Sequence, residues 1–271
     1  MITFKHTPRR KAIKWLAAAG FAVAGIHMLS ALTLDKMIQY KEVAYTSPKI
    51  SPSLDGYRIA FLTDIHNYPQ DKLAKLCENV AAREIDLALL GGDFPRVDLE
   101  RCMEIIAGIA PPDGIYGVGG NHDNPARLDG AMNRHGMVLL ENAGLTVRDG
   151  LFVAGVEDLW TRTPDVAKAV SGAGNGDFVL MLSHNPDVAE RCDLTRVDLM
   201  LSGHTHGAEF ALFGLWGPAM PIVSDHGQRF RSGFSKSAAG ADVYVSHGIG
   251  RHAPMRVFVR PQVILLTLRS I

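Results

Sequence analysis

Cysteine is scarce in this chain of 271 residues, and neither sign of charge is in excess. The three cysteines, Cys77, Cys102 and Cys192, are odd in number and form no CXXC pattern, which argues against a disulfide framework and a thiolate zinc site. The 28 basic and 28 acidic residues balance, so no overall attraction to nucleic acid is expected. There is no internal repeat and no low-complexity segment. This length and composition are typical of one large α/β domain with a sizeable core.

A long run without charged residues extends from Trp15 to Leu34. At about 1.5 Å per residue this run reaches roughly 30 Å, the thickness of the hydrocarbon core of a bilayer. Basic residues on its amino side would keep that side in the cytoplasm. The run therefore predicts an anchor in the inner (cytoplasmic) membrane, with the rest of the chain on the periplasmic side. The basic residues are Lys5, Arg9, Arg10, Lys11 and Lys14.

Residues 8–14 also resemble a twin-arginine export signal, the route of proteins that fold around a cofactor before they cross. No clear AXA cleavage site lies near Ala31, so a retained anchor and a removed signal both stay open. A soluble protein with an apolar core helix is the alternative, although core helices rarely have so uniform an apolar surface. We expect residues 1–35 to be the signal or anchor, 36–53 a connector containing prolines, and 54–271 the main domain.

Apolar strands alternate with amphipathic helices in the first part of the main domain. Residues 57–63 and 86–90 are predicted strands, while 71–84 and 99–109 have helical spacing. Asp149-Gly150 predicts a hairpin between two later strands. Together these patterns predict an α/β (α+β) fold with a two-sheet β-sandwich flanked by helices. The remaining predicted strands are 115–118, 137–140, 145–148, 151–156, 178–182, 197–201, 243–246, 256–259 and 263–268, and the remaining helices are 126–134 and one opened by Thr163-Pro164.

Five predicted strands end in side chains that bind metal ions. Open α/β sheets place ligands at the carboxyl ends of their strands, so these side chains should converge. Carboxylates, an amide and imidazoles suit Mn, Fe, Zn or Co. Two such ions need one bridging carboxylate, for which Asp93 is the candidate, and a hydroxide held between them would attack at neutral pH. The motifs are Asp64-Ile65-His66, Gly91-Gly92-Asp93, Gly119-Gly120-Asn121-His122-Asp123, Ser183-His184-Asn185 and Gly203-His204-Thr205-His206.

Taken singly, each motif also fits a turn or a helix cap, but the ordered series DXH, GGD, GNHD, His and GHTH resembles the calcineurin-like metallophosphoesterase superfamily. The resemblance covers Tyr57 to about Gly207, and residues 244–250 and 260–268 are similar to a membrane-associated, twin-arginine-exported bacterial branch. It implies that His122 fixes a phosphate oxygen or protonates the leaving alkoxide, supported by Asp123. It also implies two metal ions, one held by Asp64, His66, Asp93 and His206 and the other by Asp93, Asn121, His184 and His204.

Two positions depart from the pattern of that superfamily. Many members have an acidic residue three positions after the bridging aspartate, where this chain has Arg96, which we expect to contact phosphate. After GHTH the branch usually continues with glycine and glutamine, whereas this chain has Gly207, Ala208 and Glu209. Substrate contacts near that loop are therefore expected to differ.

The C-terminal part, from His226 to Ile271, has seven basic residues against one acidic residue, Asp242. This excess would draw an anionic substrate or lipid, with Arg251 and Arg256 as the expected contacts, although the charges also fit a solvated face of strands. Five apolar residues follow the GHTH motif and form either a lip for an acyl chain or, as is more usual, ordinary core. These residues are Phe210, Leu212, Phe213, Leu215 and Trp216. The remaining histidines, expected not to bind metal, include His135, His226, His247 and His252.

The sequence thus predicts an anchored or exported phosphoesterase with two divalent ions, Mn, Zn or Fe. Its expected substrate is a phosphodiester, pyrophosphate or monoester of an envelope lipid or nucleotide-linked precursor, an expectation that rests on family analogy. The alternatives are a nuclease or cyclic-nucleotide phosphodiesterase and an inactive metal-binding scaffold. The neutral charge and the anchor argue against the first alternative, and the intact series of ligands argues against the second.

Overall fold

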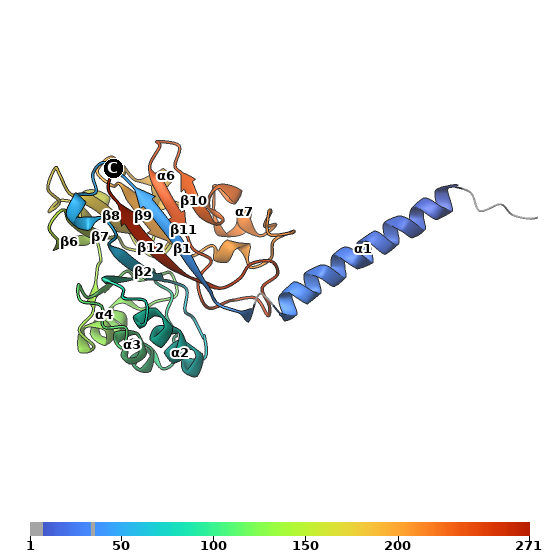
Figure 1. Cartoon of the computed structure of the whole chain (residues 1–271), viewed down its shortest axis with the longest axis horizontal. Coiled ribbons are helices and arrows are strands. Elements are labelled where there is room, and N and C mark those ends of the chain that lie inside the picture. Colours follow the sequence, from blue (N-terminus) through green and yellow to red (C-terminus); the bar gives the residue numbers. More distant parts are fainter. Residues whose placement is uncertain (1–7, 34–35) are drawn as a thin grey trace, which may run out of the picture.

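The computed structural model describes residues 8–33 and 36–271, which form a long N-terminal helix and a two-sheet domain (Figure 1). Helix α1 (Pro8–Leu32) projects away from the domain. Two six-stranded sheets pack against each other, and helices cover their outer faces. The predicted mixed fold with two sheets and an apolar N-terminal helix is therefore confirmed.

The first sheet has the strand order β1-β12-β2-β3-β4-β5. Strands β2 to β5 are parallel, so their carboxyl ends lie at the same edge. Strand β12 runs antiparallel to β2 and parallel to β1. Its elements are β1 (Gln39–Thr46), β2 (Arg58–Leu62), α2 (Gln70–Ala81), β3 (Leu87–Leu90), α3 (Leu99–Ala107), β4 (Ile115–Gly117), α4 (Pro125–Arg134), β5 (Val138–Leu139) and β12 (Gln262–Arg269).

The second sheet has the order β10-β11-β9-β8-β7-β6. Strands β7, β8, β9 and β11 are parallel, and the predicted hairpin at Asp149-Gly150 joins the antiparallel pair β6 and β7. Its strands are β6 (Ala143–Arg148), β7 (Leu151–Gly155), β8 (Phe178–Leu182), β9 (Leu199–Ser202), β10 (Gly233–Lys236) and β11 (Asp242–Val245). The short helices are η2 (Pro52–Leu54), α5 (Val166–Ala169), α6 (Val188–Arg191), η3 (His206–Ala208), α7 (Met220–Val223) and η4 (Gly227–Phe230).

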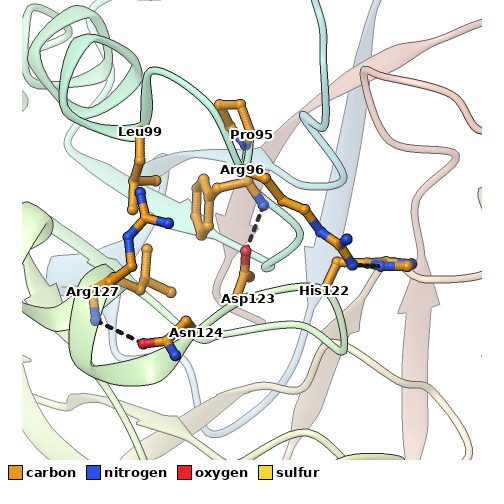
Figure 2. Close-up of a pocket in the computed structure, with 9 residues that line it drawn as sticks. Pro95, Arg96, Leu99, His122, Asp123, Asn124 and Arg127 are labelled. Atoms are coloured by element: carbon orange, nitrogen blue, oxygen red, sulfur yellow. Dashed lines mark hydrogen bonds between the residues drawn. The ribbon is translucent and has the colours of Figure 1, made fainter.

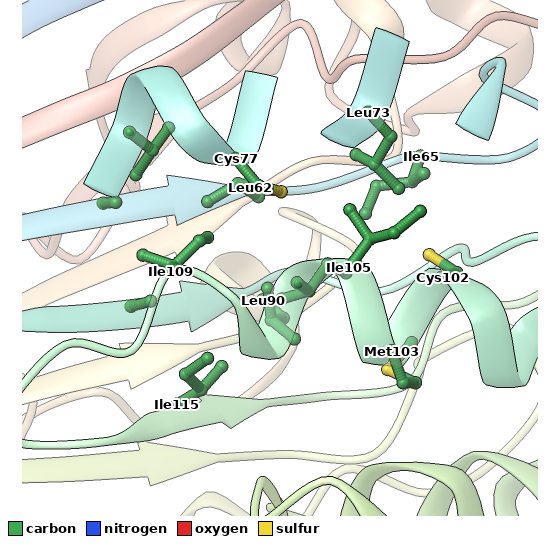
Figure 3. Packing of buried hydrophobic residues seen from close by; sticks show 14 of the residues in the cluster. Leu62, Ile65, Leu73, Cys77, Leu90, Cys102, Met103, Ile105, Ile109 and Ile115 are labelled. Carbon is green, nitrogen blue, oxygen red and sulfur yellow. The ribbon is translucent and has the colours of Figure 1, made fainter. Parts of the chain in front are cut away.

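Apolar residues cover both faces of the strands because each sheet is buried on two sides. Phe61 and Leu180 belong to the cluster between the two sheets. The next residue on β2, Leu62, points the other way and packs with Leu73 and Ile105 of the covering helices (Figure 3). These buried layers hold the strand ends in fixed positions.

The expected connector is wrong in part, because residues 39–46 form β1 and pair with β12 along their whole length. Strand β1 lies at the edge of the sheet, and none of its residues is fully buried. Its sequence consequently lacks the continuous apolar run that identified the inner strands. Strand β10, another edge strand, was missed for the same reason.

Two other expected elements are also wrong. Residues 256–259 form no strand, because Phe258 has a φ of 55° and only Val257 makes an isolated bridge, to Phe210. Thr163-Pro164 opens no helix. Helix α5 begins later, where the carboxylate of Asp165 accepts the N–H of Lys168 at 2.9 Å.

Helix α1 contains a stretch, Lys11–Leu32, that is long and apolar enough to cross a membrane. Its middle is exposed all round, whereas His27, Ser30 and Ala31 near its end are buried. The ring of His27 lies 4.8 Å from the rings of Phe213 and Phe258. Helix α1 is therefore not a core helix, and of its residues 11–32, whose side chains the structure describes, only those near the C-terminal end are buried. Of the N-terminal residues in the sequence predictions, Lys5, Leu34 and Asp35 lie outside the described residues.

Candidate metal centre

The five motifs meet where strands of the two sheets end. They follow β2, β3 and β4 of the first sheet and β8 and β9 of the second. The backbone turns sharply there, and left-handed φ angles occur at Asp64 (53°), Asp93 (58°), His204 (66°) and His206 (50°). Residues other than glycine rarely adopt this conformation, and such strain is typical of functional sites.

One group of donor atoms surrounds the Nε2 atom of His66. This atom lies 3.1 Å from Nε2 of His206 and 3.5 Å from Oδ2 of Asp93. Nε2 of His206 in turn lies 3.2 Å from Oδ1 of Asp64. These four side chains are those expected to hold the first metal ion.

A second group of donor atoms surrounds the amide oxygen of Asn121. It lies 3.0 Å from Nδ1 of His204 and 3.2 Å from Nε2 of His184. Nε2 of His184 also lies 3.3 Å from Oδ2 of Asp93. The same oxygen of Asp93 thus approaches both groups, as a bridging ligand must. Its other oxygen accepts the N–H of His122 at 2.9 Å.

Hydrogen bonding around His184 fits metal ligation. Its Nδ1 donates to the carbonyl oxygen of Gly91 at 2.7 Å, so Nε2 is the nitrogen that faces the centre. Neighbouring imidazole nitrogens lie only 3.1–3.3 Å apart, so one cation between them would be within reach of both. Both nitrogens of His247 are instead occupied, by the carbonyl of Arg260 and the hydroxyl of Ser232. The donor set therefore fits divalent cations.

The charges of the site lead to the same conclusion. Burial opposes ionisation of Asp64 and Asp93, but His206 and His184, respectively, outweigh it and hold both pKa values below the usual range. Burial would also lower the pKa of His184, yet Asp93 outweighs it and raises that pKa to about 10. Burial lowers the pKa of His66 to about 3, and the pKa of His204 likewise. Both carboxylates are therefore ionised, and two buried anions with imidazoles around them favour a cation.

Asp123 supports the backbone rather than the ring of His122. Its carboxylate accepts the N–H groups of Asp93, Phe94 and Gly120 at 2.7 to 2.9 Å, and Figure 2 draws one of these three bonds. Burial raises the pKa of Asp123 to about 6. The carboxylate thereby joins the turn after β3 to the turn after β4, and the side-chain support that was expected for His122 comes from Arg96.

The guanidinium of Arg96 lies 3.0 Å from Nδ1 of His122 (Figure 2). A guanidinium has only donors, so Nδ1 accepts this hydrogen bond and the proton of the neutral ring is on Nε2. Arg96 and His122 both line a cavity of about 250 Å³ together with His66, Arg251 and His252. Arg96 is thus placed beside the metal centre, and its guanidinium bonds His122.

His252, which was set aside in the sequence analysis, lies in the site. Its ring is 4.1 Å from the ring of His66 and 4.9 Å from those of His122 and His206. It can form a group of metal ligands with His66 and His206. No sequence motif marks this position, because His252 does not directly follow a strand. It lies in the loop between β11 and β12, which brings it to the site.

The two predicted substrate contacts lie in different places. Arg251 is exposed and lines the cavity beside Arg96. Arg256 is 3% exposed, donates to the carbonyl oxygens of His247 and Gly250, and lies 3.3 Å from Nδ1 of His206. Substrate contact by Arg256 therefore stays a prediction that would require this loop to move, whereas the position of Arg251 is open to solvent.

A second cavity, of about 280 Å³, opens directly on the donor atoms. Asp93, Asn121, His204 and His206 form its polar floor, and Trp160 lies edge-on to His204 at 4.3 Å. Its other wall is apolar and includes Ala208, Ala219 and Val223. The metal centre therefore opens between a polar wall with His122 and a wall of apolar side chains.

Residues 57–208 match the family model of calcineurin-like phosphoesterases. This match covers more than half of the chain, and the chain belongs to that family. It is a metal-dependent phosphoric ester hydrolase.

Several relatives match over most of this chain. The uncharacterized metallophosphoesterase YkuE of Bacillus subtilis is 26% identical over 98% of this chain and 99% of its own length. The phosphodiesterase YaeI of Escherichia coli is 27% identical, over 78% of this chain and 82% of its own length. A transmembrane protein with a metallophosphoesterase domain from Danio rerio is 29% identical over 82% of this chain, which covers 55% of that protein.

Proposed function

We propose that the chain hydrolyses a phosphodiester, pyrophosphate or monoester at a centre of two divalent ions, Mn, Zn or Fe. The observation that carries this proposal is the position of Asp93, one oxygen of which approaches both groups of donor atoms. The ions, when bound, would polarise the phosphoryl group and lower the pKa of water enough to supply a nucleophile at neutral pH. Asp64, His66 and His206 would hold one ion, and Asn121, His184 and His204 the other.

His122 would orient the phosphoryl group. Because Arg96 donates to Nδ1, the proton on Nε2 can be donated to a phosphoryl oxygen. Such a hydrogen bond strengthens as negative charge develops on that oxygen. Transfer of a proton to the leaving group would require doubly protonated His122, which cannot accept from Arg96. Of the two roles expected for His122, this geometry favours the hydrogen-bond donor over the acid. Arg251 would attract the anionic substrate from the rim.

The substrate is proposed to be a phosphate ester of a membrane-lipid or envelope precursor. Helix α1 supports membrane attachment because its stretch Lys11–Leu32 is long and apolar enough to cross a bilayer. The apolar wall of the cavity above the donor atoms supports an amphiphilic substrate. The names of the relatives include a phosphodiesterase and a transmembrane protein. The basic residues at the amino end of α1 favour a domain on the periplasmic side of the inner membrane.

The proposal is tested by stripping the full-length protein of metal, refilling it with Mn, Zn or Fe, and comparing bis(p-nitrophenyl) phosphate with p-nitrophenyl phosphate. We expect metal-dependent turnover, and a fall of at least 100-fold in Asp93→Asn. Asp129→Asn, an exposed change on α4, is the matched control and should stay within twofold of the parent. No turnover with any divalent ion would favour the inactive scaffold. Turnover confined to nucleic acid or cyclic nucleotides would favour the nuclease or cyclic-nucleotide phosphodiesterase.

A further inference from the structure

An apolar loop beside α1 is exposed instead of buried. We call this loop the lip, and it comprises Phe210, Leu212, Phe213, Leu215 and Trp216. Leu215 is 79% exposed and Trp216 49%, so these side chains are not the ordinary core residues that the sequence favoured. Ile222, on nearby α7, is 78% exposed. Adjacent exposed apolar side chains of this number mark a contact surface.

The lip has a defined backbone structure. Leu212 and Trp216 pair across a tight turn, where the N–H of Leu212 donates to the carbonyl of Trp216 at 2.8 Å. The N–H of Ala211 donates to the carbonyl of Val257, and the guanidinium of Arg231 donates to the carbonyl of Gly214 at 2.8 Å. The turn is therefore held in place while its apolar side chains point outward. The positive charge of Arg231 at its base suits anionic lipid headgroups.

The lip contacts α1 at His27, and the position of His27 along the helix indicates how deep the lip would lie in a membrane. The ring of His27 lies 4.8 Å from that of Phe213 and 6.0 Å from that of Phe210. His27 is five residues before Leu32, the last residue of α1, so it lies about 8 Å from the end of the helix. A helix that crosses a core of about 30 Å uses nearly all of α1. Side chains that touch His27 then lie at the boundary between headgroups and acyl chains.

The lip is also continuous with the metal centre. Ala208 and Glu209, immediately before it, and Ala219, just after it, line the cavity above the donor atoms. In Figure 1, α7 and the loops around it lie on the side of the domain from which α1 projects. The chain therefore lines the cavity on both sides of the lip.

We propose that the lip inserts into the surface of the bilayer that α1 crosses, so that the cavity takes its phosphate ester from the membrane interface. This proposal rests on the membrane attachment and activity proposed above, and it names the substrate as an amphiphile with acyl or alkyl chains. Aromatic side chains such as Trp216 are favoured at that interface. Insertion of side chains by about 5 to 10 Å is usual for surfaces that lie on a membrane.

The depth is measured by quenching in vesicles of phosphatidylcholine and phosphatidylglycerol that contain lipids brominated near the headgroup. The chain has three tryptophans, so Trp15→Phe with Trp160→Phe leaves Trp216 as the only emitter. We expect at least twofold quenching of Trp216. The matched control removes all three tryptophans and adds Val138→Trp, on the far edge of the first sheet, where quenching should stay below 10%. Equal quenching at the two positions, or none at Trp216, would overturn the proposal.

A kinetic experiment distinguishes the role of the lip from the catalytic activity. Leu215→Glu should lower turnover of hexadecyl p-nitrophenyl phosphate in vesicles at least fivefold and leave bis(p-nitrophenyl) phosphate within twofold. A parent protein that hydrolyses neither ester would contradict the proposed function, whereas quenching of Trp216 would still support the lip. Equal loss on both esters would overturn membrane capture. Absent quenching, together with a dimer in detergent that Leu215→Glu dissociates, would overturn the proposal and identify the lip as an interface between two copies.

Discussion

The carboxylate of Glu209 accepts the backbone N–H groups of His252 and Ala253, each at 2.5 Å. Its Oε1 also lies 3.6 Å from Nδ1 of His206, one of the proposed metal ligands. A single side chain thus connects the turn that carries His206 with the C-terminal loop that brings His252 into the site. Glu209 occupies a position where the sequence departs from the resembled branch. The expected difference in substrate contacts near that loop stays a prediction.

Glu209→Ala is expected to lower kcat for bis(p-nitrophenyl) phosphate about tenfold, which corresponds to about 1.4 kcal/mol of barrier. The loss of the carboxylate releases the loop at His252 and removes the partner of His206. Glu209→Gln retains one acceptor oxygen and should lose about threefold. Glu78→Ala, at an exposed ion pair with Lys75, is the control and should change nothing. Equal kcat in Glu209→Ala and Glu78→Ala would show that the loop needs no such support.

The sequence was most informative where buried strands end in metal-binding side chains. Asp64, Asp93, His184 and His204 were predictable because each follows an apolar run, and the carboxyl ends of such strands meet. His252 was not predictable, because its position depends on a loop with no periodic pattern. The hydrogen bonds of Asp123 were also not predictable. Its carboxylate accepts backbone N–H groups, and almost any residue type can supply such a group.

Some strands of the fold could be predicted from the sequence and others could not. Inner strands such as β2 and β8 are buried on both faces, so their apolar runs identify them. Edge strands β1 and β10 alternate between half-buried and exposed residues and carry too little apolar signal. The exposure of the lip could not be predicted either, because an apolar cluster in a sequence fits a core and a membrane surface equally well.

His122→Ala is expected to lower kcat by about 100-fold with either a p-nitrophenyl or an alkyl leaving group. The equal factor follows from the hydrogen bond of Arg96 to Nδ1, which leaves His122 as a donor to a phosphoryl oxygen. An acid would matter much more for the alkyl group, because alkoxide is the poorer leaving group. The kcat of the parent protein and of His122→Ala is measured with two kinds of ester. Bis(p-nitrophenyl) phosphate and methyl p-nitrophenyl phosphate supply the p-nitrophenyl leaving group, and an alkyl monoester supplies the alkyl leaving group. His135→Ala is the control. A far larger loss with the alkyl ester would assign His122 the role of acid.

Metal affinity is expected to rise about tenfold per pH unit between pH 6 and 9. His184 has a pKa raised to about 10, so in the metal-free protein it holds a proton that a bound cation must displace. In that protein the proton stabilises the fold fully below pH 6.5, and the stabilisation is lost as the pH rises through about 10. Calorimetric titration with Zn in buffers of different ionisation enthalpy counts the released proton. An affinity that does not change with pH would contradict a protonated His184.

Gly120→Ala is expected to lower metal affinity at least 100-fold. A Cβ atom at this position would collide with Oδ1 of Asp93 and lie 2.8 Å from the backbone nitrogen of Asp93, so the carboxylate would have to turn away from the donor atoms. The matched control is Gly176→Ala, since nothing lies within 4 Å of a Cβ atom there. Calorimetric titration with Zn gives the affinity of each variant, and circular dichroism verifies that both remain folded. If folded Gly120→Ala bound metal as tightly as Gly176→Ala, the carboxylate of Asp93 could not be the ligand that joins the two groups.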